Sequence, residues 1–255
     1  MAEHGKGDDA TYFGSVAESY DRLQPIIAGS GYSEGLTMMV ELVRHERLDA
    51  FRFVELGCGT AELSRRVLER FPRSTGIGID SESAMVEVAR KKLASYGDRF
   101  RLCEADVGSC DLPACDLVLS SYVFHHVAPR DLRGMLARIA GALEPDGCLI
   151  LLDQMKARTP WGGRLAAQGR RIHQRHVAAA IAAGRATQAE VGARWELKRR
   201  TKSEGMDVEF IHTAEDVLDV MLAAGFNEAG LVWRRFASTI LVAFAPAEPS
   251  TAGEQ

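Results

Sequence analysis

The sequence lacks long hydrophobic runs, an excess of positive charge and a signal-like leader, and each absence argues against a class of protein. No segment approaches the roughly 20 apolar residues that a membrane-spanning helix needs. The formal net charge of −4 argues against a general nucleic-acid binder. Residues 1–10 are polar and glycine-rich and have no apolar core of the signal-peptide type. We therefore expect a cytoplasmic protein without a membrane partner.

The sequence is also poor in metal-binding signals. Its five cysteines include no Cys-x-x-Cys pair. Cys103, Cys110 and Cys115 lie near one another in the sequence, but no histidine stands at zinc-ligand spacing from them. We expect reduced structural thiols and no metal site.

From residue 51 onward, short apolar runs alternate with patterns typical of helices, in a chain of 255 residues. The predicted strands are 52–56, 75–79, 99–103, 115–120 and 147–152. The predicted helices are 60–70, 82–95, 130–143 and 214–224. Strands separated by helices of this length indicate parallel βαβ units. Two further strands, 229–235 and 238–244, are predicted to form a hairpin.

The segments around this core have a different pattern. Apolar residues at helical spacing predict a helix from Tyr12 to Leu23, and we expect Pro25 and the turn at 29–31 to break the chain. A second helix should run from Ser33 to about Arg47. The resulting domain boundaries are a helical cap over 1–50, a core domain over 51–155 and 208–246, a basic helical insertion over 156–207, and a disordered tail over 247–255.

A glycine-rich turn follows the first strand of the core, in the order Glu55-Leu56-Gly57-Cys58-Gly59-Thr60-Ala61-Glu62. Gly57 and Gly59 allow a tight turn and a close approach of the backbone to a nucleotide-like ligand. A dinucleotide fingerprint would place its third glycine at position 62, where the Glu62 carboxylate would repel a pyrophosphate. The turn therefore predicts a different kind of nucleotide ligand.

The pattern Glu-x-Gly-x-Gly-x-Ala resembles motif I of the class I S-adenosylmethionine (SAM)-dependent methyltransferases. Ala61 replaces the third glycine of that motif, which is a small change in size. The resemblance implies a doubly wound, Rossmann-like α/β fold with a seven-stranded, mostly parallel sheet. It also implies SAM as the cofactor and S-adenosylhomocysteine as the product.

Polar residues at the ends of the next strands fit the parts of SAM in order, because the ligand of an open α/β sheet lies beyond the carboxyl ends of its strands. Asp80 can accept hydrogen bonds from the ribose hydroxyls, although a helix N-cap is the alternative. Asp106 can accept from the adenine amino group with Val107 over the ring, or Asp106 can be a surface turn residue. Ser120 and Ser121 lie where the methionine portion would bind.

Four further residues complete the predicted cofactor site of the core domain. Cys58 and Ser81 lie within the turns that carry Gly57 and Asp80. Glu55 ends a buried strand and needs a partner, for which the amino group of SAM is suitable. Met85 fits the class I pattern Asp-x-Ser-x-x-Met, in which it packs on adenine, but it can equally be a core methionine.

His125 and His126 are the candidate catalytic residues, since they follow the fourth strand close to the expected methyl group. A histidine there can act as a general base on a hydroxyl, an amine or an acidic carbon. The run Phe-His-His-Val also resembles a class I sequence in which one histidine is structural. Alignment of the acceptor with the methyl group can supply much of the acceleration without a base.

The resemblance extends beyond motif I. Residues 16–22 with 31–34, and the segments 223–226 and 233–236, resemble a subset that includes the carboxy-SAM synthase of tRNA wobble-uridine modification. In that subset the N-terminal helices close over SAM, which implies lid roles for Tyr20 and Arg22, although Tyr20 can equally be core. The predicted substrate lid contains Tyr122, Arg170, Arg185, Arg194 and Arg199.

These patterns favour a SAM-dependent methyltransferase that acts on oxygen, nitrogen or carbon of a small molecule in secondary metabolism. An arginine-rich lid suggests an anionic acceptor, with a solvated helical face as the alternative. The other function class is a carboxy-SAM synthase or a SAM-binding protein linked to tRNA modification. A nucleic-acid acceptor has less support because aromatic and basic residues do not interleave. A homodimer is compatible with the sequence.

Overall fold

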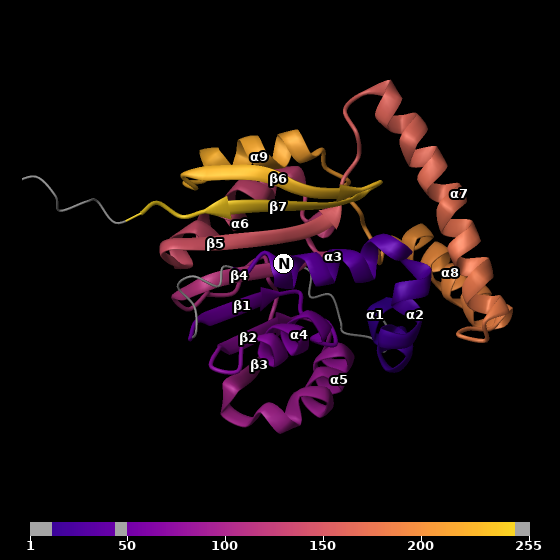
Figure 1. Cartoon of the computed structure of the whole chain (residues 1–255), viewed down its shortest axis with the longest axis horizontal. Helices are drawn as coiled ribbons and strands as arrows, with labels where there is room; N and C mark the ends of the chain where they lie inside the picture. Colours follow the sequence, from indigo (N-terminus) through magenta and orange to yellow (C-terminus); the bar gives the residue numbers. More distant parts are fainter. Residues whose placement is uncertain (1–11, 44–49, 248–255) are drawn as a thin grey trace, which may run out of the picture.

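A computed structural model describes residues 12–43 and 50–247, and its centre is a seven-stranded sheet in the order β3-β2-β1-β4-β5-β7-β6 (Figure 1). The strands are β1 Arg52–Leu56, β2 Thr75–Asp80, β3 Phe100–Glu104, β4 Cys115–Ser121, β5 Leu143–Gln154, β6 Glu228–Arg235 and β7 Ser238–Phe244. β1 to β5 pair in parallel, and β7 runs antiparallel to both of its neighbours. The predicted mostly parallel sheet with a C-terminal hairpin is confirmed.

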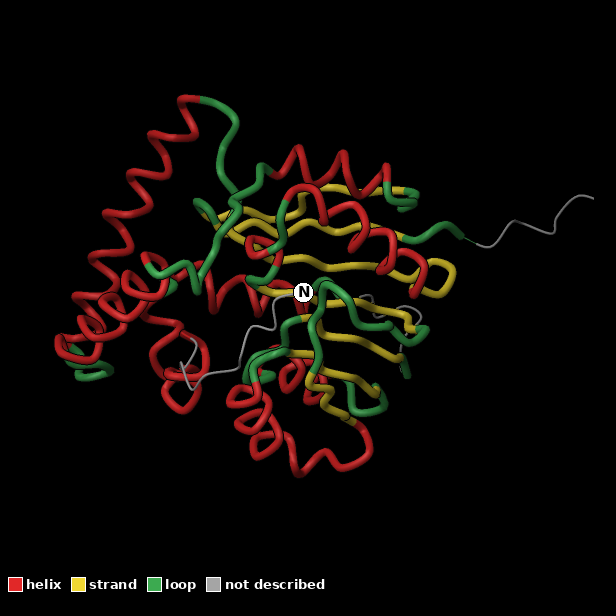
Figure 2. The backbone as a smooth tube through the Cα atoms, turned by 180° about the vertical axis from the view of Figure 1, so that it is seen from behind, coloured by secondary structure: helices red, strands yellow, loops and turns green. Residues whose placement is uncertain are grey.

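Helices cover both faces of this sheet (Figure 2). They are α1 Tyr12–Val16, α2 Tyr20–Ile27, α3 Ser30–Glu41, α4 Glu62–Arg70, α5 Ser83–Leu93, α6 Pro129–Ala142, α7 Pro160–Ala182, α8 Gln188–Ser203 and α9 Ala214–Ala223. Neighbouring residues of β1 face opposite layers: Phe53 packs in the core under α3 and α4, and Val54 in the core under α6 and α9. Successive side chains of a strand point to opposite faces of the sheet, so both faces are apolar and each is covered by a layer of helices.

Three predicted boundaries in and around the cap are wrong or lie outside the described residues. Pro25 does not break the chain, because α2 continues past it to Ile27. α3 begins at Ser30, directly after Gly29, whose φ of 85° is favourable for glycine alone. The predicted end of this helix at Arg47 lies outside the described residues, and so does the predicted tail from residue 248 onward.

The fifth strand begins four residues earlier than predicted. The sequence Glu144-Pro145-Asp146-Gly147 reads as a turn between a helix and a strand, yet β5 starts at Leu143, directly after α6. Asp146 takes a left-handed φ of 61°, and the pairing of β4 with β5 shifts register near this end. The turn residues therefore form an irregular start of the strand rather than a separate loop.

The cap and the insertion pack against each other beside the carboxyl ends of the strands (Figure 1). α1 contacts α8 and α2 contacts α7. Leu23 and Ile26 of α2 share a small core with Val177 of α7 and Val191 of α8. No helix within the described residues is long and apolar enough to cross a bilayer.

Candidate functional site

The glycine-rich turn between β1 and α4 has the backbone conformation that its composition predicts. Gly57 and Gly59 have φ of 63° and 52°, in the left-handed region. A Cβ at Gly57 would lie 2.2 Å from a methyl carbon of Val123, whereas a Cβ at Gly59 would meet no atom within 4 Å. Gly59 therefore borders open space, and a ligand can approach the backbone there. This geometry fits the nucleotide-like cofactor expected at the turn.

Ala61 differs from the third glycine of motif I in conformation more than in size. It is fully buried and takes φ 56° and ψ 38°, the left-handed region that glycine enters without steric cost. The sequence comparison considered only the small volume of alanine. The structure shows that this position requires a left-handed backbone conformation. The surrounding turn holds Ala61 in that conformation, which is unfavourable for alanine.

Asp80 connects the glycine turn to the start of α5. Its Oδ2 accepts a hydrogen bond from the N–H of Gly59 at 2.7 Å, and its Oδ1 accepts from the N–H of Glu82 at 2.9 Å. Burial raises the pKa of the Asp80 carboxyl above its usual value, and the two backbone bonds oppose that shift. The N-cap residue of α5 is Glu82, so Asp80 bonds to the backbone just before the helix rather than at the N-cap position itself. The carboxylate keeps acceptor capacity for ribose hydroxyls.

Glu55 finds its partner inside the protein. Its Oε2 accepts from the backbone N–H of Ser64 at 3.0 Å and from the Ser64 hydroxyl. Burial raises the pKa of Glu55 to about 8, and the bonds to Ser64 oppose the shift. The sequence predicted the amino group of SAM as this partner. The first turn of α4 supplies a partner to Oε2 within the protein, because it brings Ser64 over the end of β1.

The loop after β3 holds Asp106 in a local turn. The Asp106 Oδ1 accepts from the N–H of Gly108 at 2.6 Å, and the residue is exposed. Val107 is half-buried against the apolar layer on the α6 side of the sheet. The turn alternative for Asp106 therefore describes its bonding here, while its exposed carboxylate stays available to a ligand. Ser81, after β2, is also exposed.

The end of β4 lies beside the glycine turn. Ser120 is buried and its hydroxyl donates to the carbonyl of Leu56 at 3.3 Å, so this serine mainly joins β4 to β1. Ser121 is half-buried at the end of the strand. Cys58 is buried, and its backbone N–H donates to the carbonyl of Ile79 at 3.0 Å. The strand ends thus converge on one edge of the sheet, as predicted.

Two residues predicted at the cofactor have their contacts elsewhere, Met85 with the cap and Arg22 with the insertion. Met85 is buried in an apolar cluster with Tyr12, Val16 and Ala17 of the cap, which agrees with its core alternative. Arg22 forms an ion pair with Glu190 of α8, with 2.5 Å between Nη2 and Oε1. Arg22 therefore joins the cap to the insertion in this structure.

Asp21, which the sequence analysis did not single out, joins the cap to the glycine turn. Its Oδ1 accepts from the Thr60 hydroxyl at 2.6 Å, and its Oδ2 lies 2.5 Å from Nζ of Lys92. Adjacent residues of α2 thus contact the cofactor turn and, through Arg22, the insertion. The cap is held over the strand ends from both sides.

A cavity of about 250 Å³ lies between the cap, the strand ends and α8. Its lining includes Tyr12, Phe13, Tyr20, Gln24, Ile27, Ala28, Tyr122, His125, His126, Gln154, Trp195, Lys198, Asp207 and Glu209. Segments far apart in the sequence supply these side chains, and aromatic rings form much of the wall. Such a concave, mostly apolar site with a few polar groups is typical of a small-molecule pocket.

Tyr20 and Tyr122 line this cavity, as their predicted lid roles require. Burial raises the pKa of the Tyr20 hydroxyl, and Arg194 opposes this shift. Tyr122 takes a left-handed φ of 59° and its hydroxyl lies 2.9 Å from Oγ of Ser238. Its ring stacks on Tyr32 of α3 with 5.5 Å between centroids. Both tyrosines are therefore fixed in place by the cap.

His126 lines the cavity, and only one of its two ring nitrogens has a hydrogen-bond partner among the described residues. Its Nδ1 lies 3.0 Å from the carbonyl oxygen of Val208, and its Nε2 is buried with no hydrogen-bond partner among the described residues. Burial lowers the pKa of His126, and the neighbouring His125 lowers it further. The neutral ring therefore offers an unpaired nitrogen, as a general base requires.

His125 has a structural environment. Its Nδ1 lies 2.6 Å from Oδ1 of Asp153, and its backbone N–H donates to Oδ2 of the same residue at 3.1 Å. Both residues are buried. Asp153 was missed by the sequence analysis, although a carboxylate near the end of the fifth parallel strand follows the same strand-end rule that identified Asp80. Asp207 lies in a loop and has no comparable sequence signal.

The four arginines predicted for the substrate lid do not converge on the cavity. Arg170, Arg185 and Arg199 are exposed, and Arg199 pairs with Glu196 one helical turn away. Arg194 alone is buried next to the cavity. Its Nε donates to the Tyr12 hydroxyl at 2.8 Å and its Nη2 donates to Oε1 of Gln24 at 3.1 Å, whereas Nη1 is buried without a partner among the described residues.

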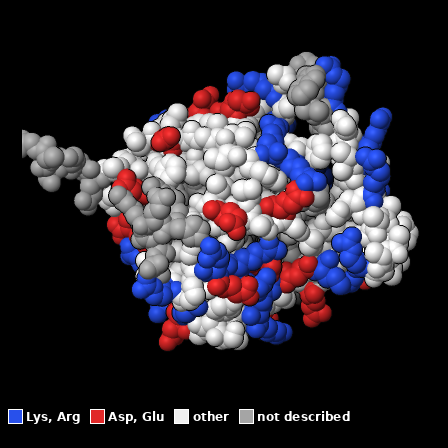
Figure 3. Space-filling model, viewed as in Figure 1, with Lys and Arg blue, Asp and Glu red and all other residues white. Residues whose placement is uncertain are grey.

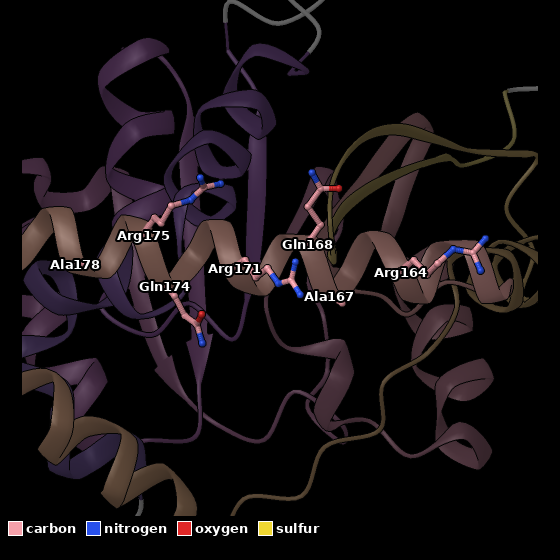
Figure 4. Close-up of a pocket in the computed structure, with 7 residues that line it drawn as sticks. All are labelled: Arg164, Ala167, Gln168, Arg171, Gln174, Arg175 and Ala178. Carbon is pink, nitrogen blue, oxygen red and sulfur yellow. The ribbon is translucent and has the colours of Figure 1, made fainter.

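A larger hollow of about 950 Å³ runs along α7 and is lined by that helix alone (Figure 4). Arg164, Arg171 and Arg175 project from it, and Figure 3 shows basic side chains along this part of the surface. None of the predicted cofactor residues lines this hollow. The arrangement agrees with the solvated-face alternative for the basic insertion.

Comparisons with known proteins agree with this geometry. Residues 53–147 match a family model described as a methyltransferase domain. A carboxy-S-adenosyl-L-methionine synthase from Actinobacillus succinogenes is 30% identical over 154 residues, which cover 58% of this chain and 63% of that protein. The chain thus spans less than two thirds of this curated relative.

Solved structures that resemble this chain include methyltransferases. An O-methyltransferase family protein from Burkholderia thailandensis has a TM-score of 0.59 and 17% identity, covering 85% of this chain and 57% of its own. Human N-acetylserotonin methyltransferase in complex with SAM has a TM-score of 0.57 and 16% identity. The match covers 94% of this chain and 60% of the human chain. Residues 53–147 match a methyltransferase domain, and the chain has the Rossmann-like α/β fold of these class I neighbours. The cofactor of this class is SAM.

Proposed function

We propose that this protein transfers the methyl group of SAM to the oxygen or nitrogen of a small-molecule acceptor held in the 250 Å³ cavity. The observation that carries the proposal is the unpaired Nε2 of His126, on a ring that lines a cavity beside the strand ends. Unpaired buried polar atoms are rare in folded proteins and tend to mark functional positions. Transfer to carbon and a role in secondary metabolism stay predictions of the sequence.

The residues proposed to hold the cofactor follow the strand ends. Gly57 and Gly59 would allow its approach, Asp80 would accept from its ribose, Asp106 would accept from its adenine, and Ser121 would lie at its methionine portion. When bound, SAM supplies a methyl group on a positively charged sulfur, and the sulfur keeps the electron pair of the broken bond in the S-adenosylhomocysteine product. Positioning this group against the acceptor lowers the entropic part of the barrier.

His126 is proposed to accept the proton that the acceptor loses. The carbonyl of Val208 can only accept a hydrogen bond, so the proton of the neutral ring is on Nδ1 and the lone pair is on Nε2. Tyr20 and Tyr122 would orient the acceptor and exclude water. We also propose that residues 1–50 act as a cap and residues 156–207 as an acceptor lid over the core formed by 51–155 and 208–246.

The test is a two-part measurement on the purified full chain. Calorimetry with SAM and with S-adenosylhomocysteine should give binding that Asp80→Ala abolishes. Labelled SAM should then transfer its methyl group to members of a panel of phenols and amines. SAM binding without transfer to any phenol or amine in the panel would count against the methyltransferase proposal.

A carboxy-SAM synthase is the second candidate, since the curated relative is named as one. The unpaired Nη1 of Arg194 favours it, because a buried guanidinium N–H is a strong donor to a carboxylate. Mass spectrometry of the ligand extracted from the purified protein distinguishes the two candidates. SAM or S-adenosylhomocysteine supports methyl transfer, and a ligand heavier by a carboxyl group supports the synthase.

A further inference from the structure

The charged side chains that line the cavity are two carboxylates and one lysine, although the sequence predicted an arginine-rich pocket. They are Asp207, Glu209 and Lys198. The carboxylates lie in the segment that follows α8. The negative charge at the cavity therefore comes from this segment, and α8 contributes one lysine, Lys198, whereas α7 contributes none of the lining side chains.

The Glu209 carboxylate is balanced within the protein. Nζ of Lys198 lies 2.9 Å from its Oε1, and Nζ of Lys202 lies 2.7 Å from its Oε2. Each oxygen thus has its own ammonium partner. Glu209 therefore has partners for both oxygens within the protein, and the positive charge of Lys202 also acts on Asp207 from beyond ion-pair distance.

Asp207 has no such balance. The residue is 5% exposed, and its Oδ1 has no hydrogen-bond partner among the described residues. The nearest basic atom is Nδ1 of His126 at 3.6 Å, but that nitrogen directs its proton to the carbonyl of Val208. No lysine or arginine in the described part of the chain lies within ion-pair distance of Asp207, and Arg194 is bonded to Tyr12 and Gln24.

A buried carboxylate oxygen without a hydrogen-bond partner is costly, because it loses its hydration, and the charge of Lys202 beyond ion-pair distance offsets only part of that loss. Since Asp207 lines the cavity, a ligand can reach it and supply the missing charge. Aromatic rings of Phe13, Tyr122 and Trp195 line the same cavity. Rings of this kind attract both a planar ligand and an organic cation.

We infer that the acceptor is an arylalkylamine, whose ammonium group binds the carboxylate of Asp207 while its ring packs among Phe13, Tyr122 and Trp195. The inference rests on the proposed function in that the cavity is the acceptor site. It names the class of acceptor and replaces the anionic acceptor suggested by the arginine content. Asp207 is thus a specificity-determining residue.

Three probes that share a phenol ring and differ only in charge test the inference. They are tyramine, which carries an ammonium group, 4-ethylphenol, which is neutral, and 4-hydroxyphenylacetate, which carries a carboxylate. Their dissociation constants are measured by calorimetry on the full chain saturated with S-adenosylhomocysteine. Tyramine should bind at least about tenfold more tightly than 4-ethylphenol, and 4-hydroxyphenylacetate should bind most weakly.

The variant Asp207→Asn removes the charge and keeps the shape of the side chain. It should bring tyramine and 4-ethylphenol to within about twofold of each other, without changing the affinity for S-adenosylhomocysteine. The matched control is Asp216→Asn, which removes an exposed carboxylate of α9 that pairs with Arg158 and should leave the order of the probes unchanged. The melting temperature of each variant confirms that it is folded.

Equal affinity of the wild-type protein for the three probes, or tightest binding of 4-hydroxyphenylacetate, would overturn the inference even if Asp207→Asn failed to fold. The readout is binding, so it separates the two proposals. Charge-selective binding without methyl transfer would leave the inference standing and count against the methyltransferase. Methyl transfer to phenols without regard to their charge would do the reverse.

Discussion

Nδ1 of His126 lies 3.0 Å from the carbonyl oxygen of Val208, a residue 82 positions further along the chain. The segment after α8 thereby fixes the tautomer of a histidine at the end of β4. A backbone carbonyl holds the Nδ1 proton, and the lone pair of Nε2 is buried without a partner among the described residues. The folded insertion and the strand end thus depend on each other for the proposed base.

Replacing His126 with Ala should lower kcat about 100-fold or more with the acceptor found in the screen, because a positioned general base contributes on that scale. Affinity for SAM should stay within about twofold. The control is His176→Gln, which alters a histidine of α7 whose Nε2 lies 3.3 Å from the carbonyl of Pro25. Wild-type turnover by His126→Ala would contradict the assignment.

The activity should also depend on pH in a direction set by His126. Burial lowers its pKa below 6.5, His125 lowers it further, and the bond to Val208 with the charges of Asp207 and Asp153 opposes the shift. The base must be neutral, so kcat/KM should be constant near pH 7 and fall on the acid side below pH 6.5. A pH profile of the wild-type enzyme tests this, and the acid limb should be absent in His126→Ala.

The buried pair of His125 and Asp153 should contribute to stability. His125→Ala leaves the Asp153 side chain, which is 1% exposed, without its ring partner. The free energy of unfolding should fall by about 2–3 kcal/mol, the cost of an unsatisfied buried polar group plus lost packing. Urea denaturation measures this. The double variant with Asp153→Ala should lose less than the sum of the single variants.

Asp80→Ala should abolish SAM binding in calorimetry at millimolar ligand. The substitution removes the proposed ribose contact and also the acceptor that holds the N–H of Gly59 and the N–H of Glu82. Asp111→Ala, which alters an exposed carboxylate in the loop after β3, is the control. Near-wild-type affinity in Asp80→Ala would refute the ribose assignment.

Glu55 should make the free protein less stable as the pH rises. The folded-state pKa is raised to about 8, from about 4.5 in the unfolded chain, so the folded protein keeps a proton that the unfolded chain releases. The stabilisation is complete below pH 4.5 and is lost as the pH approaches 8. Glu55→Gln should remove this dependence. The difference in unfolding free energy between variant and wild type, followed by urea denaturation across this range, measures it.

The sequence predicted the parallel order of strands and helices because each element carries its own periodicity, and the strand-end rule then placed Gly57, Asp80 and Ser120 on one edge. It failed where local patterns have two solutions. Pro25 can end a helix or lie in its last turn, and the packing of α2 against α7 decided for the latter. Glu55 needed a hydrogen-bond partner, and Ser64 of the next helix supplies one within the protein.

The acceptor side could not be predicted in the same way, because its residues share no local pattern. Phe13, Tyr122, Trp195 and Asp207 come from the cap, a strand end, a helix and a loop, and only their packing brings them to one cavity. The sequence by itself determined the class of fold and its cofactor, since a glycine turn and its neighbouring strand ends are short-range features. The tertiary structure alone decided that Arg170, Arg185 and Arg199 are exposed whereas Arg194 and Asp207 are buried, since burial depends on contacts between distant segments.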